Sequence, residues 1–463
     1  MTDLPFLPLT EAATLVAAKQ LSPVEYTEAL LRRIETHDSR LASFLHLTAD
    51  AAIAAAREAE AAVQAGATLG PLHGIPFGLK DIIDAEGLAT TAHSKILADN
   101  VAAEDAEATA RLKAAGGILL GKLATHEFAL GGPCFDLPWP PARNPWDPSK
   151  HPGGSSSGSG VAVAAGFLPA ALGSDTGGSV RNPASSCGLV GMKATYGRVS
   201  RRGVVPLSFS LDYVGPLTRT VADNAAVLNV IAGHDARDPG SAAVPVPDFT
   251  ARLDKDIKGL RIGVIRHFYT RDLVADPEMT AAIEAALKTL QGLGAEVREI
   301  EARPLRAYAA CNRTILLSEA FAVHEQWLKE RPEDYGALTR ERLLPGAFVP
   351  AVDYVQAVRS RRRLKAEFDR LTADLDVVVT ASSMEPPCAI DDPEMVAKTY
   401  SRQARPPFNV TGNPALVLPT GFSSAGMPLS MQIVGKPFDE ATVYQVAQAY
   451  EQASPWKDRH PEL

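Results

Sequence analysis

Two serine- and glycine-rich segments and one lysine carry the chemistry that this sequence is best equipped to perform. GGSSSGSG contains Ser155, GSDTGGSVRNPA contains Ser179, and the upstream segment GIPFGLKDIID holds Lys80 among apolar residues. A serine hydroxyl is a poor nucleophile unless a base removes its proton, and a lysine can be that base only where its surroundings keep the amine neutral. The pattern indicates a hydrolase with a serine nucleophile and a lysine base.

Small residues surround the candidate nucleophile. Thr176, Gly177 and Gly178 directly precede Ser179. Most single serines occupy turns or helix caps, but successive glycines let backbone N–H groups converge on one point. Such donors stabilise the oxyanion of a tetrahedral intermediate, each by about 3 kcal/mol where measured.

The residues next to Lys80 give conflicting signals about its charge. Apolar neighbours such as Phe77 and Ile82 would lower the pKa of the amine by burial, whereas Asp81 and Asp84 would favour the charged form. The sequence alone leaves the outcome open.

Taken together, the three segments resemble the amidase signature family, in its order and spacing, from about Leu9 to the end of the chain. The resemblance implies that Lys80 is the catalytic lysine and that Ser179 is the nucleophile that forms the acyl-enzyme. It implies that Ser155, held after a cis peptide bond, relays the proton between them. It also implies hydrolysis of carboxylic amides, with esters and carbamates as plausible further substrates, and no metal or cofactor.

Further roles rest on the same resemblance. The backbone amides of Thr176, Gly177, Gly178 and Ser179 would form the oxyanion hole, and Ser156 would support the lysine by a hydrogen bond. The segment departs from the commoner GGSSGG by having Ser157 in place of a glycine. Because serine is also small, we expect little effect on the loop.

The segment between the lysine and serine motifs could determine substrate specificity. Family members commonly flank the site with the backbone near Ala129, Gly131 and Gly132, and Phe135 and Trp139 could line an acyl or aryl pocket. Ordinary packing beneath a proline-rich loop explains these aromatic residues equally well.

Two other patterns fail as ligand sites. GGILLGK begins like a phosphate-binding loop, but Leu123 stands where a Ser or Thr should follow and the intervening residues resemble a strand. His126 and Glu127 begin the zinc motif HExxH, but Leu130 replaces its second histidine. We therefore predict no metal site.

Composition limits partners and location. The net charge of −8 gives no basic footprint for nucleic acid, and the basic run at 358–371 is typical of a solvated helix face. Four dispersed cysteines favour a reducing compartment, and we find no signal peptide or membrane span. We expect a cytoplasmic enzyme acting on a small-molecule amide, without nucleic acid or membrane partners. A homodimer is compatible with the family.

Alternating strand and helix patterns predict a layered α/β fold. Residues 1–70 read as helices, 71–235 as a core that carries the motifs, and 303–375 as a helical insertion or lid. With the resemblance, this predicts one amidase signature domain over 1–463, an α/β/α sandwich around a large mixed sheet.

Three functions remain open. The first is a stand-alone amidase. The alternative is the glutaminase subunit of a transfer-RNA-dependent amidotransferase, which belongs to the same family and works with partner chains. That subunit usually shows a stretch like EASSNLARYDG, where this chain reads LSEAFAVHEQWLKE. The third, a binding protein with a dead site, is disfavoured because all three triad residues are present.

Overall fold

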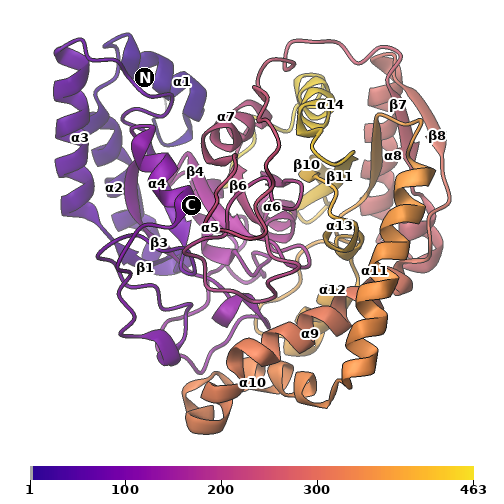
Figure 1. Ribbon diagram of the computed structural model, residues 1–463. Coiled ribbons are helices and arrows are strands. Elements are labelled where there is room, and N and C mark those ends of the chain that lie inside the picture. The colour runs from indigo at the N-terminus through magenta and orange to yellow at the C-terminus, as the bar shows by residue number, and fades with distance from the viewer. Residues whose placement is uncertain (1–3) are drawn as a thin grey trace.

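A mixed sheet of 11 strands forms the centre of the computed structural model, which describes residues 4–463 (Figure 1). The strands, in chain order, are β1 (Phe44–Leu47), β2 (Pro76–Lys80), β3 (Ile118–Leu123), β4 (Ala170–Ser174), β5 (Val190–Lys193), β6 (Val214–Thr218), β7 (Arg261–Val264), β8 (Glu296–Glu299), β9 (Val377–Ala381), β10 (Ala415–Phe422) and β11 (Pro428–Gly435). Their spatial order is β1-β3-β2-β4-β6-β5-β10-β11-β9-β7-β8. Parallel pairs join β3, β2 and β4 at one side of the sheet and β9, β7 and β8 at the other.

Helices cover both faces of this sheet. They are α1 (Leu9–Ala17), α2 (Pro23–Leu41), α3 (Ala49–Gln64), α4 (Glu107–Ala114), α5 (Ser157–Ala164), α6 (Arg181–Cys187), α7 (Val221–Ile231), α8 (Pro277–Gly292), α9 (Leu305–Glu330), α10 (Ala337–Leu343), α11 (Ala351–Leu371), α12 (Pro393–Ser401), α13 (Pro406–Thr411) and α14 (Glu440–Gln452). Along β4, α5 packs on the face of Gly173 and α7 on the face of Leu172. The predicted α/β/α fold is confirmed.

Glycine permits the close approach of α5 to the sheet. A Cβ at Gly173 would lie 2.6 Å from the Ser156 hydroxyl oxygen, so a larger residue at position 173 would displace the start of α5. Because GGSSSGSG leads into α5, this contact fixes one motif against the strand that leads into the other.

The N-terminal helices lie at one end of the sheet, on the left of Figure 1. Ser22 caps α2 by accepting hydrogen bonds from the amides of Val24 (3.1 Å) and Glu25 (3.2 Å), and Pro23 occupies the first helical position. The sequence pattern predicted helices throughout this region, but residues Phe44–Leu47 form the edge strand β1. Four residues are too few for a strand pattern to be recognised without its partner, β3.

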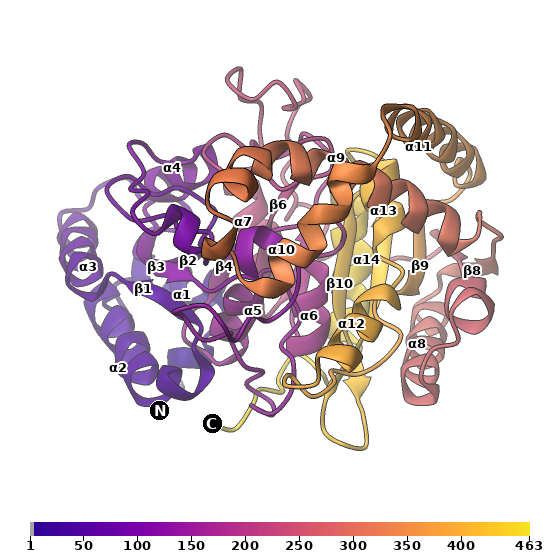
Figure 2. The same ribbon diagram turned by 90° about the horizontal axis from the view of Figure 1, so that it is seen from below.

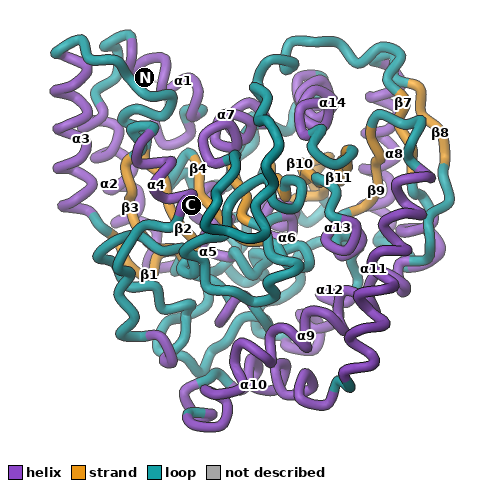
Figure 3. Tube along the Cα trace, in the orientation of Figure 1, coloured by secondary structure: helices purple, strands orange, loops and turns teal. Residues whose placement is uncertain are grey.

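Helices α9, α10 and α11 build the segment predicted to be a helical insertion. Figure 2 shows α9 and α10 lying across the middle of the molecule and α11 beside the far end of the sheet. Loops gather in front of α5 and α6 (Figure 3), next to these helices. Within the described residues, no helix is both long and apolar enough to cross a membrane.

Candidate active site

Strand pairing positions the lysine and places a serine beside it. β2 and β4 are parallel neighbours, so Lys80 at the end of β2 and Ser174 at the end of β4 reach the same edge of the sheet. The Lys80 Nζ donates to the Ser174 hydroxyl at 2.8 Å. No sequence pattern singles out Ser174, because only the register of β2 and β4 brings it to the lysine.

The GGSSSGSG loop brings a second serine to the same amine. The peptide bond between Gly154 and Ser155 is cis, as the resemblance implied. The Ser155 hydroxyl accepts a hydrogen bond from the Lys80 Nζ at 2.6 Å, and both side chains are buried. The loop then enters α5 at Ser157.

Ser156 supports the lysine by a different route from the one implied. Its hydroxyl contacts the main chain of Ser174, at 3.2 Å from both the amide nitrogen and the carbonyl oxygen. The direct bond expected between Ser156 and Lys80 is therefore replaced by a contact that positions Ser174, which itself bonds the lysine.

A buried ion pair shapes the loop that carries Ser179. The Asp175 carboxylate accepts hydrogen bonds from the amides of Val180 (3.2 Å) and Arg181 (3.4 Å) and from the Arg181 guanidinium (3.0 Å). Asn409 donates to the same carboxylate at 2.8 Å. Burial alone would raise the pKa of Asp175, but Arg181 and Asn409 hold it well below the usual range. Asp175 is therefore a fixed anion that closes the turn from both sides.

Ser179 lies where its own loop contacts the GGSSSGSG loop. The Ser156 amide donates to the Ser179 carbonyl at 3.3 Å, which ties the nucleophile loop to the GGSSSGSG loop. The Ser179 residue is partly exposed, whereas Lys80, Ser155 and Ser174 are buried. Of these four residues, Ser179 alone is partly exposed to solvent.

Thr176, Gly177 and Gly178, with Ser179, form the loop predicted to be the oxyanion hole. The Thr176 hydroxyl donates to Asp212 at 2.6 Å, and its carbonyl accepts from Asn312 of α9 at 3.2 Å. Gly178 has φ +133°, a conformation that favours glycine. The loop is rigidly held, and the role of its amides stays a prediction.

Burial decides the charge of Lys80. It lowers the pKa of the amine to about 7, and the distant carboxylates of Asp212 and Asp175 offset this only in part. Asp81 contributes little because it pairs with the buried Lys122 at 2.9 Å. That lysine belongs to GGILLGK, whose strand-like residues form β3. Burial of Lys80 and the pairing of Asp81 with Lys122 of β3 thus resolve the conflict between apolar and acidic neighbours that the sequence left open.

Two histidines and a tyrosine also surround the site. The His126 amide donates to the Ser155 carbonyl at 3.0 Å, and its imidazole packs on Gly154. The imidazole ring also contacts the rings of His151 and Tyr400. His126 was considered in the sequence only as part of a failed zinc motif, and Tyr400 gave no signal.

The residues predicted to bind substrate lie in two different surroundings, and the backbone positions are buried. Ala129 is buried with φ +59°, and the Gly131 carbonyl accepts from Arg342 at 2.7 Å. Gly132 packs against Leu338 of α10. These backbone positions therefore lie beneath the helical segment.

The two aromatic residues of this segment lie nearer its surface. The Phe135 residue is 54% exposed, and Trp139 is partly buried with its ring edge-on to His93. Their contacts fit the packing alternative as well as a pocket wall, so their role in binding stays a prediction.

Comparison with known proteins finds matches over nearly the whole chain. The family model described as amidase matches residues 25–444. A protein of Chloroflexus aggregans, named as a glutamyl-tRNA(Gln) amidotransferase subunit, is 41% identical over 100% of this chain and 99% of its own length. A solved structure from a vestigial protein complex bearing on the origins of an s-triazine catabolic enzyme has a TM-score of 0.90 at 33% identity, covering 96% of this chain and 98% of its own. A peptide amidase solved with the inhibitor chymostatin has a TM-score of 0.87 at 32% identity, covering 98% and 99%.

Proposed function

The chain belongs to the amidase family, and from that premise we propose that it hydrolyses a carboxamide through an acyl-enzyme on Ser179. Lys80 is the base and Ser155 the relay. The observation that carries this proposal is the 2.6 Å contact between the Lys80 amine and the Ser155 hydroxyl, made by a lysine whose pKa is lowered to about 7. An amine with that pKa can both accept and return a proton near neutral pH.

The proposed proton path runs from Ser179 through Ser155 to Lys80, and the contact between Lys80 and Ser155 at 2.6 Å supports its second transfer. As the Ser179 oxygen attacks the carbonyl carbon, its proton passes to Ser155, and the Ser155 proton passes to neutral Lys80. The charge that develops on the carbonyl oxygen is stabilised by the backbone amides of residues 176–179. The proton then returns through Ser155 to the leaving nitrogen, the C–N bond breaks, and water releases the acid by the same path.

The substrate proposal follows the named relative. At 41% identity over the full chain, the Chloroflexus protein supports the glutaminase interpretation over the stand-alone amidase that the sequence favoured. On this interpretation the amide is glutamine, and partner chains and a transfer RNA complete the assembly. The sequence-based expectation of no nucleic-acid partner, which rested on the net charge of −8, then needs revision.

One observation keeps the stand-alone amidase as a second candidate. LSEAFAVHEQWLKE, which replaces the usual pattern of the glutaminase, lies in α9 and is used for internal contacts. Its Glu319 accepts hydrogen bonds from the Ser208 hydroxyl at 2.6 Å and the Ser210 amide at 3.0 Å. The solved peptide amidase, with a TM-score of 0.87, shows that a protein named as an amidase shares this architecture.

Ammonia or amine release by the purified chain separates these two functions. We expect turnover of at least one of glutamine, aliphatic amides, aryl amides and carbamates, and a loss of about 10⁴-fold or more in Ser179→Ala. Turnover of glutamine alone, and only slowly, supports the partner-dependent glutaminase. Rapid turnover of another amide supports the stand-alone enzyme. Undiminished turnover in Ser179→Ala would overturn the proposed nucleophile.

A further inference from the structure

A small cavity beside the nucleophile loop holds more hydrogen-bond donors than the mechanism above uses. Among its polar lining residues are His151, Asn182, Ser383, Glu385, Tyr400 and Arg405. Asn182 donates to the Gly154 carbonyl at 3.2 Å, so the cavity adjoins both catalytic loops. The role inferred for this cavity rests on the proposed function.

Arg405 forms one wall, directly against the nucleophile loop. A Cβ at Gly178 would lie 2.6 Å from the Arg405 Nε, so the side chain fills the space that the glycine leaves. The side chain is buried, with 1% of the residue exposed. Because Gly178 adjoins Ser179, the Arg405 side chain lies beside the loop that carries the proposed nucleophile.

The partners of Arg405 within residues 4–463 are neutral. Its Nε donates to the Gln403 side-chain oxygen at 2.7 Å, and its Nη1 donates to the hydroxyls of Ser382 (3.1 Å) and Ser383 (2.7 Å). Arg181, by contrast, has the Asp175 carboxylate at 3.0 Å. Burial, and then the charge of Arg181, lowers the pKa of Arg405 to about 9, and Tyr400 and Asp175 offset this only in part. Asp175 is already paired with Arg181, and a buried cation without its own paired anion is unfavourable, so an incoming anion would relieve it.

His151 adds a second donor. The Gly153 amide donates to its Nδ1 at 2.9 Å, and burial lowers the pKa of the ring to about 4, so the ring is neutral and its proton sits on Nε2. That Nε2 is buried and has no hydrogen-bond partner in the described part of the chain. A buried N–H of this kind needs an acceptor, which a ligand can provide.

The acid in the lining is already paired. The Glu385 Oε1 contacts the Arg402 Nε, and its Oε2 lacks a hydrogen bond within residues 4–463. Arg402 also lines the cavity, and the Arg342 guanidinium carbon lies 5.9 Å from the centroid of the Tyr400 ring. Cations therefore outnumber acids around the cavity, while Oε2 can accept from an N–H of the same ligand.

We propose that the amide substrate carries a carboxylate, which Arg405 binds in this cavity with the His151 Nε2–H as a second donor. The substrate class is the short monoamide of a dicarboxylic acid, including its α-amino derivatives. Arg405 is thus a specificity-determining residue, and the carboxylate completes a buried ion pair that the free protein lacks.

Matched substrates test the proposal. We expect wild-type kcat/KM for succinamate to exceed that for its methyl ester, assayed by ammonia release, by about 100-fold. In Arg405→Gln this ratio should fall toward one. Arg361→Gln is the control, because this arginine of α11 also donates to neutral oxygens, the carbonyls of Val410 and Ser210, and does not line the cavity. Its ratio should stay at the wild-type value.

Binding without turnover separates this proposal from the catalytic one. In Ser179→Ala, succinate should bind and raise the melting temperature, and adding Arg405→Gln or His151→Ala should weaken that binding by about 100-fold and about tenfold respectively. A wild-type ratio near one, equal loss on both substrates in Arg405→Gln, or succinate binding that is unchanged by Arg405→Gln would overturn the role of Arg405. Failure of the nucleophile test with intact succinate binding would instead overturn the catalytic proposal alone.

Discussion

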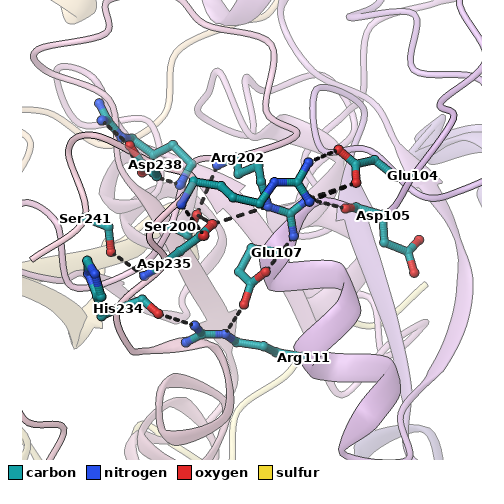
Figure 4. Close-up of polar contacts among 12 residues, drawn as sticks. Glu104, Asp105, Glu107, Arg111, Ser200, Arg202, His234, Asp235, Asp238 and Ser241 are labelled. Atoms are coloured by element: carbon teal, nitrogen blue, oxygen red, sulfur yellow. Dashed lines mark hydrogen bonds and ion pairs between the residues drawn. The ribbon is translucent and has the colours of Figure 1, made fainter. Parts of the chain in front are cut away.

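Two groups of charged residues differ in burial and in how many partners each charge has. One lies at the catalytic edge, the sheet edge at which Lys80 and the loop of Asp175 and Arg181 meet. The other joins α4 to loops near residues 200–202 and 234–241. At the catalytic edge, Lys80, Asp175 and Arg181 are each 0% exposed; burial lowers the pKa of Lys80, and Asp175 pairs with Arg181 at 3.0 Å. In the network of Figure 4, Arg202 contacts Glu107 at 2.5 Å and Asp235 at 3.3 Å, with Glu104 at 3.6 Å.

Charges in this network have more than one partner, so the network should tolerate the loss of a single side chain. Glu107 also pairs with Arg111 at 2.8 Å, and Arg111 donates a hydrogen bond to the His234 carbonyl at 3.0 Å (Figure 4). The Glu104 side chain is 57% exposed, so water screens its contacts. If Arg202 is removed from this network, Glu107 keeps Arg111 as an ion-pair partner. At the catalytic edge, removal of Arg181 leaves the buried Asp175 carboxylate without its ion-pair partner. Burial, and not the number of ion pairs, therefore determines which charges control chemistry.

Replacing Lys80 should have the largest effect and should separate activity from stability. We expect Lys80→Met to reduce kcat by about 10³-fold or more, because the base is lost. A lysine with a folded pKa of about 7 and an unfolded pKa of 10.5 binds fewer protons when folded, so its unfavourable contribution to stability is greatest below pH 7 and fades as the pH rises toward 10.5.

Denaturation in urea at pH 6 measures that contribution. Lys80→Met should unfold at higher urea, with a gain of about 1–3 kcal/mol after loss of its two hydrogen bonds. A marked loss of stability together with retained activity would contradict the assignment of Lys80 as a buried, functionally strained base.

Breaking the Asp175–Arg181 pair should have the next largest effect. Arg181→Met leaves a buried carboxylate and should lower the free energy of unfolding by about 3–5 kcal/mol. Asp175→Asn with Arg181→Met removes both charges and should recover part of that loss, a coupling measurable by a double-mutant cycle in urea. Additive effects of the two substitutions would show that the pair does not act as a unit.

The surface network should give the smallest effect. Arg202→Met should cost about 1 kcal/mol in dilute buffer and less in 1 M NaCl, where the screening length is about 3 Å. The kcat of this variant should match that of the wild type, since Arg202 lies outside the catalytic edge. A loss as large as that of Arg181→Met would remove the distinction drawn between the two regions.

The sequence predicted the elements with clear local patterns and the residues inside distinctive motifs. The helix at Pro23–Leu41, the strand bearing Lys80 and the loop bearing Ser179 were all located correctly. Short elements were missed, among them β1, α6 and α13, because four to seven residues give little periodicity.

Partners brought together by long-range pairing could not be predicted. Ser174 contacts Lys80 because β4 pairs with β2 in a particular register. Lys122 of β3 forms an ion pair with Asp81, which directly follows β2. Arg405 reaches Gly178 from a segment more than 200 residues away. Each of these residue types is ordinary in sequence, and only burial and proximity give it a role.

The pH dependence of kcat/KM tests the central claim, that Lys80 acts as a neutral base, most directly. Because the amine must be deprotonated to accept the Ser155 proton, activity should rise about tenfold per pH unit below pH 7 and level off above it, following the pKa of about 7. A substrate without ionisable groups, such as a simple aliphatic amide, keeps the profile free of other titrations. A profile that is flat or falling between about pH 6 and 8 would contradict the assignment of Lys80.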